Sequence, residues 1–353
     1  MWSAIAVALI GGLYLIFRAY VKLTYRFWSK QPVFHWYDLL YYVASPKRVE
    51  KGVPLVDEYV NLVDIRTTEI DEEKDKEAIR FVRSHHRLAK HWVESLYGNN
   101  NPSFLSTYRQ QDQLYGVLTA RSLTLCLKGQ REIPLYYLDN LCIHRGMRQR
   151  DIAPQLLRTT YYQLRRLRPS IDAYLFKREE ANTAIVPLVT YRSVVYPLGS
   201  IPKRRFPHAS HTLIEINGEK LVLLLDLVDT QRERFECVLL PDVSNLARML
   251  EKERWHVYGI LERDRLKAAY IFIPGEKWTN MVASIDACEF TDIFQIGFEQ
   301  ACARLDKPIA LDRIGDSIRL RVPSNPTFEY PSSYYMYNYI APTQPNNKCL
   351  ILN

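Results

Sequence analysis

The stretch that decides the fold is YYLDNLCIHRGMRQRDIAP, residues 136–154. An apolar and aromatic run ends there in a cluster of arginines, and a helical pattern follows with one apolar side formed by Ile152, Leu156, Leu157, Leu164 and Leu167. The order is therefore strand, turn and helix start. Backbone N–H groups at a helix start have no partner within the helix, so arginines beside them complete an anion site. We expect a phosphate-bearing ligand there.

The composition is that of a globular chain, and 353 residues suffice for one large domain or two medium ones. Lys and Arg number 47 against 39 Asp and Glu, and 47 − 39 = +8. This excess would suit a nucleic acid, an anionic membrane surface or a polyphosphate cofactor, and the charge alone does not choose among them. The six cysteines are scattered without a C-x-x-C pair, which favours reduced thiols in a cytosolic domain. His85, His86 and His91 have no third ligand placed by spacing, so no metal site is predicted.

The N-terminal residues 2–17 carry no charge, and Arg18 and Lys22 follow. A membrane span needs about 20 apolar residues, which this run reaches only if residues 19–23 join it with both basic side chains snorkelling. The charge follows the apolar run instead of preceding it, which argues against a secretory signal. We predict a single-pass anchor over residues 1–23 that leaves the domain facing the cytoplasm; the alternative is a buried or surface-lying helix.

Further along, patterns of apolar residues and turns predict the remaining elements. A strand at 114–127 and a strand ending at Asn140 form a hairpin around Gly129, and a further strand covers 173–176. Residues 182–197 form an irregular apolar run, and Asn217-Gly218 is predicted to turn a second hairpin. The other predicted elements are a charged helix at 71–82, a helix at 240–252, a hairpin of 255–260 with 266–273, a helix at 292–305 and a strand at 308–311. Strand, helix and strand thus occur twice in order, which indicates a mixed α/β fold.

A hairpin, a strand ending in an anion-binding turn, a helix and another strand is the plan of the GNAT-type acyltransferases. Residues 140–154 resemble more closely the acyl-CoA signature of the N-myristoyltransferase (glycylpeptide N-tetradecanoyltransferase) family. Three further segments are similar to that family in the same order: residues 25–33, the hairpin start at 114–116, and the tyrosine-rich ending 334–338 with the apolar C-terminus 350–353. The resemblance covers most of residues 25–353, with poor agreement in 84–111 and 200–250. It implies two tandem GNAT-like halves, an acyl-CoA-binding half at 24–199 and a half with the peptide groove at 200–353.

The resemblance also implies transfer of a myristoyl group from acyl-CoA to an N-terminal glycine amine. The backbone N–H groups of Asn140 and Leu141, where the strand bulges, would form the oxyanion hole, although the family usually has an aromatic residue at the position of Asn140. The C-terminal carboxylate of Asn353 would accept the amine proton; taken alone, residues 350–352 would be only a strand in a core. No covalent intermediate is needed, so Cys142 need not be a nucleophile.

The co-substrate implied by the resemblance is myristoyl-CoA, with no permanently bound cofactor and no metal. Backbone N–H groups of residues 149–153 would hold the phosphates, with Arg148 and Arg150 adding charge. The expected acyl-CoA-binding residues are Tyr25, Arg26, Phe27, Trp28, Leu141, Cys142, Ile143, Arg148, Gln149, Arg150, Asp151, Ile152 and Ala153.

Two departures from the family qualify these expectations. Asp151 stands where relatives usually have a basic residue, and it would repel a phosphate. The family's acidic loop over the peptide corresponds here to the basic residues 84–91, so acceptor preference should differ, or the acceptor is not a peptide.

Two other functions stay open. One is a GNAT-fold enzyme that uses another acyl chain or amine, and the other is a catalytically silent acyl-CoA-binding protein. The expected partners are acyl-CoA, peptides with an N-terminal glycine and a membrane reached through the N-terminal helix. We expect a monomer and no nucleic acid.

Overall fold

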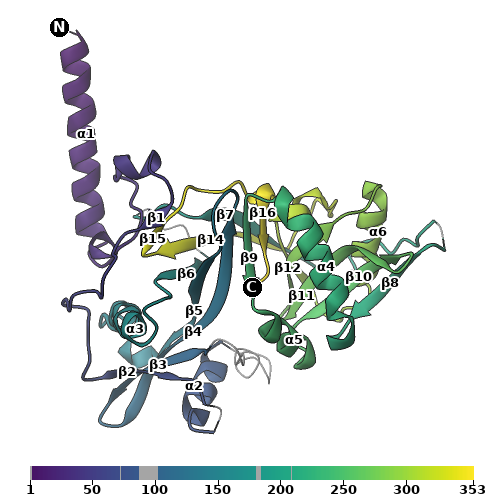
Figure 1. Ribbon diagram of the computed structural model, residues 1–353, viewed down its shortest axis with the longest axis horizontal. Helices are drawn as coiled ribbons and strands as arrows, with labels where there is room; N and C mark the ends of the chain where they lie inside the picture. The colour runs from purple at the N-terminus through teal and green to yellow at the C-terminus, as the bar shows by residue number, and fades with distance from the viewer. Residues whose placement is uncertain (1, 72, 87–101, 180–183, 208) are drawn as a thin grey trace.

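The computed structural model describes residues 2–71, 73–86, 102–179, 184–207 and 209–353. Over these residues a single large sheet with helices packed on it forms the body (Figure 1). The first helix, α1 (Trp2–Thr24), extends away from that body. It is long and apolar enough to cross a membrane, and only 6% of its most apolar window is buried.

The N-terminal unit contains the stretch that opened the sequence analysis. Its elements are β2 (Ile65–Glu69), α2 (Lys76–His86), β3 (Phe104–Gln110), β4 (Gln113–Leu127), β5 (Ile133–Ile143), α3 (Ile152–Leu167) and β6 (Ala173–Arg178). Strands β3, β4 and β5 pair antiparallel, and β5 pairs parallel with β6 because α3 makes the crossover between them. The predicted hairpin, helix and last strand are confirmed, and β5 runs on past Asn140. Leu167 is half exposed, whereas Ile152, Leu156 and Leu164 are buried.

The second unit repeats this plan. It consists of β8 (His211–Ile216), α4 (Leu221–Gln231), α5 (Val243–Glu251), β10 (His256–Glu262), β11 (Arg265–Pro274), β12 (Thr279–Asp286), α6 (Thr291–Cys302) and β13 (Ile309–Asp312). Again an antiparallel series is followed by a parallel pair, β12 with β13, connected through a helix. The predicted hairpin, helix and strand of this region are confirmed.

Four strands join the two units into one sheet. They are β7 (Val189–Tyr196), β9 (Cys237–Pro241), β14 (Phe328–Tyr337) and β16 (Cys349–Ile351). β14 lies between β6 and β7, β7 pairs with β13, and β9 connects β4 to β16. A separate small pairing joins β1 (Lys47–Arg48) to β15 (Tyr339–Ile340). Strands from both sides of the predicted boundary at 199/200 therefore pair with each other, and the division into two halves stays a prediction.

Several predicted elements were wrong in type or extent. No hairpin turns at Asn217: β8 pairs with β10, and the Asn217 side chain accepts a bond from the Lys220 N–H at the start of the helical segment that leads into α4. The run predicted as irregular contains the regular strand β7. Leu240 belongs to β9, so the following helix begins later than predicted, and α2 begins at Lys76 instead of residue 71.

Candidate active site

The end of β5 carries the bulge that the resemblance implies. The pairing of β4 with β5 slips, so that Thr119 faces Asp139 and Val117 faces Cys142. Asn140 and Leu141 thus lie opposite the single residue Leu118, and Asn140 has a left-handed φ of 52°. A bulge of this kind bends the strand and turns backbone groups out of the ladder.

Asn140 is held in this bulge by buried polar contacts. Its Nδ2 donates to Thr119 Oγ1 at 2.9 Å, and that hydroxyl donates to the Asp139 carbonyl at 3.0 Å. The Asn140 backbone N–H donates to Asp139 Oδ1 at 2.8 Å. To serve an acyl oxygen, this N–H must therefore exchange the Asp139 carboxylate for the substrate.

A cleft of about 390 Å³ opens at the start of α3. Its lining includes most of the residues predicted to bind the cofactor: Leu141, Ile143, Arg148, Gln149, Asp151, Ile152 and Ala153, together with Met147 and Pro154. Gln149 and Asp151 both have left-handed φ values, 63° and 54°, which turn the chain sharply into the helix. The Asp151 side chain makes no capping bond, so the helix start has no side-chain cap. An anion there would meet unsatisfied N–H groups.

Six of the thirteen residues predicted to bind the cofactor lie outside the lining of this cleft: Arg150, Cys142 and the four residues from Tyr25 to Trp28. Arg150 is exposed and does not line it. Cys142 is buried in an apolar cluster with Val82 and Val117. Burial, with Asp139 adding to it, raises the pKa of the Cys142 thiol to about 12, so this group is neutral at physiological pH.

The aromatic segment predicted to grip coenzyme A packs against β6. Trp28 stacks on Phe176 with ring centroids 5.1 Å apart, and Phe27 meets Tyr59 edge-on at 5.0 Å. Tyr25 is partly buried and Arg26 is exposed. The Tyr59 carbonyl accepts a bond from Thr159 Oγ1 at 3.4 Å, so Tyr59 lies between this segment and α3. Burial raises the pKa of Tyr59.

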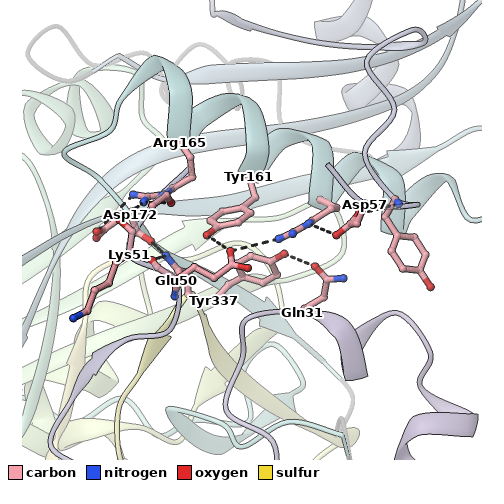
Figure 2. A network of polar contacts seen from close by, with 12 residues as sticks. Gln31, Glu50, Lys51, Asp57, Tyr161, Arg165, Asp172 and Tyr337 are labelled. Carbon is pink, nitrogen blue, oxygen red and sulfur yellow. Dashed lines mark hydrogen bonds and ion pairs between the residues drawn. The ribbon is translucent and has the colours of Figure 1, made fainter. Parts of the chain in front are cut away.

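A polar network fixes α3 (Figure 2). Arg158 Nε bonds Asp57 Oδ2 at 2.7 Å, and the Tyr161 hydroxyl donates to Glu50 Oε2 at 2.8 Å. Arg165 donates to the Gly52 carbonyl at 2.7 Å and lies 3.6 Å from Asp172. These contacts tie the buried side of the helix to residues 50–57, so the helix start is held in position before any ligand arrives.

A second cavity, of about 690 Å³, lies where β4 and β5 meet the C-terminal end of the chain. Asn353 lines it: Arg121 Nη2 donates to Asn353 Oδ1, and Asn353 Nδ2 donates to the Tyr334 hydroxyl at 3.2 Å. Sequence reasoning missed other lining residues, namely Arg121, Tyr137, Asp139, Lys177, Arg254, Asp312 and Tyr334. The available signal was a charged residue inside an otherwise apolar strand, as at Arg121 and Asp139.

The charges in this cavity are buried and partly paired. Burial lowers the pKa of Arg121 and of Arg254, and Asp139 opposes the shift in both. Burial alone would also lower the pKa of Lys177, but Asp312 at 3.7 Å and the neighbouring tyrosines raise it above its ordinary value. His85 reaches the same cavity, whereas residues 87–91 of the predicted basic loop lie outside the described residues.

The bulge lies between residues of β5 that line different cavities. Asp139 lines the cavity with Asn353, Leu141 lines the cleft at α3, and Asn140 lies between them. A group bound in the cleft could therefore present a carbonyl at Asn140 and Leu141 to a nucleophile in the other cavity. Among the described residues, no cluster of three His, Cys, Asp or Glu could hold a metal.

Solved structures of N-myristoyltransferase have the same fold as this chain. The structure of Saccharomyces cerevisiae N-myristoyltransferase with bound myristoyl-CoA superposes with a TM-score of 0.70 at 15% identity, over 93% of this chain and 99% of the yeast chain. A complex of that enzyme with myristoyl-CoA and inhibitors gives 0.69 at 15% identity, over 95% and 96%. A GCN5-related N-acetyltransferase from Kribbella flavida gives 0.52 at 14% identity, over 77% and 70%. No family model and no curated protein sequence matches the chain. The predicted fold is confirmed.

Proposed function

We propose that this protein transfers a long acyl chain, myristoyl in the first instance, from acyl-CoA to the amine of an N-terminal glycine. The observation that carries the proposal is the bulge at Asn140, which separates a cleft suited to an anionic cofactor from a cavity that holds the C-terminal residue. The yeast neighbours bind myristoyl-CoA on the same fold.

In the proposed reaction the amine nitrogen attacks the thioester carbonyl carbon, and the C–S bond breaks. The N–H groups of Asn140 and Leu141 stabilise the negative charge on the carbonyl oxygen. Coenzyme A leaves as a thiolate and becomes the thiol by taking up the proton that the attacking nitrogen loses when the amide forms. The thiol of Cys142 takes no part, because it is buried and neutral.

The amine must lose a proton, because its reference pKa is about 7.7–8.0. We assign this proton to the terminal carboxylate of Asn353, a residue that lines the 690 Å³ cavity, here called the acceptor cavity, and whose side-chain amide contacts Arg121 and Tyr334. Asp139 is a second carboxylate in that cavity and is the alternative acceptor.

For the cofactor, the proposal places the phosphates at residues 149–153 and the pantetheine along Leu141 and Ile143. Arg148 supplies charge from the cleft wall, and Arg150 supplies it from the outside. Tyr25, Arg26, Phe27 and Trp28 are proposed to contact the part of coenzyme A that extends past Tyr59.

We further propose that α1 anchors the protein in a membrane as a single span, with the catalytic unit on the cytoplasmic side and acting as a monomer. The support is the apolar length of residues 5–24 and their exposure. An active site beside a bilayer would release its acylated product next to the surface that receives it.

The test is an assay of the full chain in detergent with myristoyl-CoA, shorter and longer acyl-CoAs, and a library of glycine-starting peptides, read by mass spectrometry. A mass gain of one acyl group on the peptide amine is the expected result. Transfer only to lysine or a small amine would favour another GNAT-type activity. Binding of acyl-CoA without transfer to any acceptor would favour a silent binding protein.

A further inference from the structure

A loop beside α1 exposes a compact apolar surface. Residues 36–43, here called the 36–43 loop, include the short helix η2 (Leu39–Tyr42). Leu39 is 62% exposed, Leu40 80% and Val43 86%, and the rings of Trp36 and Tyr42 are exposed as well. Contiguous exposed apolar side chains of this kind mark a contact with a protein or a membrane.

The loop is fixed to the middle of α1. The Tyr14 hydroxyl donates to the Tyr37 carbonyl at 3.1 Å, and the Arg18 guanidinium lies 5.5 Å from the centre of the buried Tyr37 ring. Tyr14, Arg18 and Val21 are spaced to share one side of the helix, and Val21 is fully buried. The second half of α1 therefore contacts the body at Tyr14, Arg18 and Val21, while its other side chains are exposed, and α1 as a whole extends away from the body (Figure 1).

The base of the loop is rigid and its polar groups point inward. His35 bonds the Trp28 carbonyl through Nε2 at 2.8 Å and Asp38 Oδ2 through Nδ1 at 3.0 Å. The Tyr41 N–H donates to the Asp38 carbonyl at 2.8 Å. These bonds leave the apolar tips, Leu39, Leu40 and Val43, pointing to the outside of a defined backbone.

The position of the loop determines where a bilayer surface can lie. If the surface of the bilayer lay at Thr24, its hydrocarbon would cover the charged side chains of Arg18 and Lys22. It would also cover the part of the body that contacts Tyr14. If the surface of the bilayer instead lies at the level of Tyr14 to Arg18, the side chains of Arg18 and Lys22 lie among the lipid headgroups. Residues 2–17 then supply about 24 Å of helix, less than the roughly 30 Å of hydrocarbon. The bilayer accommodates such a short span by local thinning. Insertion of the apolar side chains of the 36–43 loop at the same depth is consistent with this placement.

From this geometry we infer that the 36–43 loop is a second membrane contact, which inserts Leu39, Leu40 and Val43 into the cytoplasmic leaflet at the depth of Tyr14 to Arg18. The inference rests on the anchor proposed for α1. Trp36 and Tyr42 are residues that favour the membrane interface. Lys47, whose Nζ lies 5.5 Å from the Tyr41 ring centre, and Arg18 provide positive charge for anionic headgroups. The loop would then set the height and tilt of the body above the bilayer.

The experiment places a fluorescent reporter in the loop of the full chain, reconstituted in phosphatidylcholine and phosphatidylserine vesicles. Leu40→Trp adds a tryptophan to the loop. Val243→Trp, at the exposed first residue of α5, adds one on the side of the body away from the free end of α1 (Figure 1). Both positions are exposed, so neither substitution should disturb the core. Emission is measured with lipids brominated near the headgroup or deep in the acyl chain, and the wild-type signal is subtracted.

We expect the emission added by Leu40→Trp to be quenched severalfold more by the shallow bromines than that added by Val243→Trp. Equal, weak quenching of both in protein that still floats with the vesicles and resists alkaline extraction would overturn the loop contact and leave the anchor intact. Protein that fails to float would overturn the anchor and the loop contact together. Acyl transfer in detergent is measured in parallel, so that failure of the catalytic proposal is recorded separately.

Discussion

The two units of the sheet share a plan but differ at the junction where the last antiparallel strand, β5 in the first unit and β12 in the second, leads into its helix. In the first unit residues 144–151 make a long turn with three arginines, and a cleft of about 390 Å³ opens beside it. In the second unit residues 287–290 connect β12 to α6 directly, and the hollow next to them is about 40 Å³. The same topology therefore leaves room for a ligand at one junction only.

The charge at the two junctions also favours an anion at the first one only. At the second junction the Cys288 N–H already donates to Asp286 Oδ1 at 3.0 Å, and Glu289 and Asp292 follow. A carboxylate occupies the position that a phosphate would take, and further acids would repel it. At the first junction the only acid, Asp151, makes no capping bond. Space and charge therefore both favour the first unit as the site for the proposed binding of coenzyme A.

The helices differ as well. Gly297 lets α6 lie directly on the sheet, because a Cβ there would meet the Tyr270 hydroxyl at 2.6 Å and the Ile260 side chain still closer. The part of the second unit beneath α6 is thereby packed as a structural element, so changes there should alter the stability of the protein. Asp312 of β13 belongs to the same unit but lines the cavity with Asn353, so changes at that position can also alter the chemistry.

The largest effect should come from blocking the end of the chain. A short tag appended after Asn353 removes the proposed carboxylate and fills the acceptor cavity, so we expect kcat to fall about 10²–10⁴-fold, the range for loss of a general base. The same tag placed before Met1 is the control. Single-turnover rates with myristoyl-CoA provide the measurement. Full activity of the C-terminally tagged chain would mean that Asp139, and not the terminal carboxylate, accepts the amine proton. The Asp139→Asn variant then tests this alternative.

In the second unit, loss of the buried carboxylate of Glu299 should lower the stability of the protein and leave cofactor binding unchanged. Glu299, 2% exposed, accepts bonds from Arg204 Nη2 at 2.8 Å and Gln295 Nε2 at 3.1 Å. Glu299→Gln should cost about 2 kcal/mol at pH 7, the value of a bond to a charged group, because Arg204 keeps a weaker neutral partner. The free energy of unfolding in urea measures this, and the dissociation constant of acyl-CoA should stay unchanged.

The pH dependence of this loss has a definite sign. Burial opposes ionisation of Glu299, but Arg204 and Gln295 hold its pKa below the ordinary value. The stabilisation by the ionised side chain is therefore present above the unfolded-state pKa of about 4.3 and disappears as the pH falls through the lowered folded-state pKa. Wild type and Glu299→Gln should approach each other in strong acid. A constant difference down to pH 2 would contradict the role of the charge.

In the first unit, removal of an arginine from the cleft should weaken the binding of myristoyl-CoA. Arg148 lines the cleft and Arg150 does not, so Arg148→Ala should raise the dissociation constant of myristoyl-CoA about tenfold and Arg150→Ala less, since a charge-assisted bond contributes about 1.5 kcal/mol or more. Calorimetric titration measures both. Arg192→Ala, which removes an exposed arginine paired with Glu329, is the matched control and should change nothing. An equal change of the dissociation constant in all three variants would mean that the arginines act only through the net charge of the protein and not through contacts in the cleft.

Asp151 should act in the opposite direction and more weakly. Asp151→Asn removes the charge but keeps a residue that tolerates the left-handed backbone at φ 54°. A carboxylate near a helix start is worth about 0.3–1 kcal/mol to the helix, and a comparable repulsion of a phosphate would change affinity only about two- to fivefold. The dissociation constant should therefore fall by this factor, and more at low salt. A rise would mean that Asp151 contributes to binding by positioning the turn.

How far the sequence predicted these features depended on how local their causes are. The hairpin of β4 and β5, helix α3 and strand β6 follow from apolar spacing and turns within some sixty residues, and all were predicted. Strand β7 was not, because it gains its partners from β13 and β14, which are distant in sequence. The Asn217-Gly218 pair has a hairpin signature, yet tertiary packing buries Leu224 and Leu227 on a helix.

The candidate site shows the same limit. The turn at residues 144–151 and the bulge residues could be placed from one continuous stretch. The cavity lined by Asn353 could not, because Arg121 and Asp139 lie close together in the predicted hairpin of β4 and β5, but Asn353 reaches them only through the pairing of β9 with β4 and β16. A single charged residue in an apolar strand indicates a buried polar contact, but it does not identify the partner.

The smallest effect should follow removal of Cys142, although its two neighbours in sequence, Leu141 and Ile143, line the cleft. Cys142 is 3% exposed and burial raises the pKa of its thiol to about 12, so between pH 7 and 9 almost none of it is thiolate. Cys142→Ala should therefore keep kcat within about twofold and cost roughly 1 kcal/mol of stability from the lost packing. Rates measured over this pH range, with and without iodoacetamide, test this. A loss of transfer larger than 10²-fold in folded Cys142→Ala would indicate an acyl-cysteine intermediate, and mass spectrometry of the wild type during turnover would then detect it as a thioester adduct.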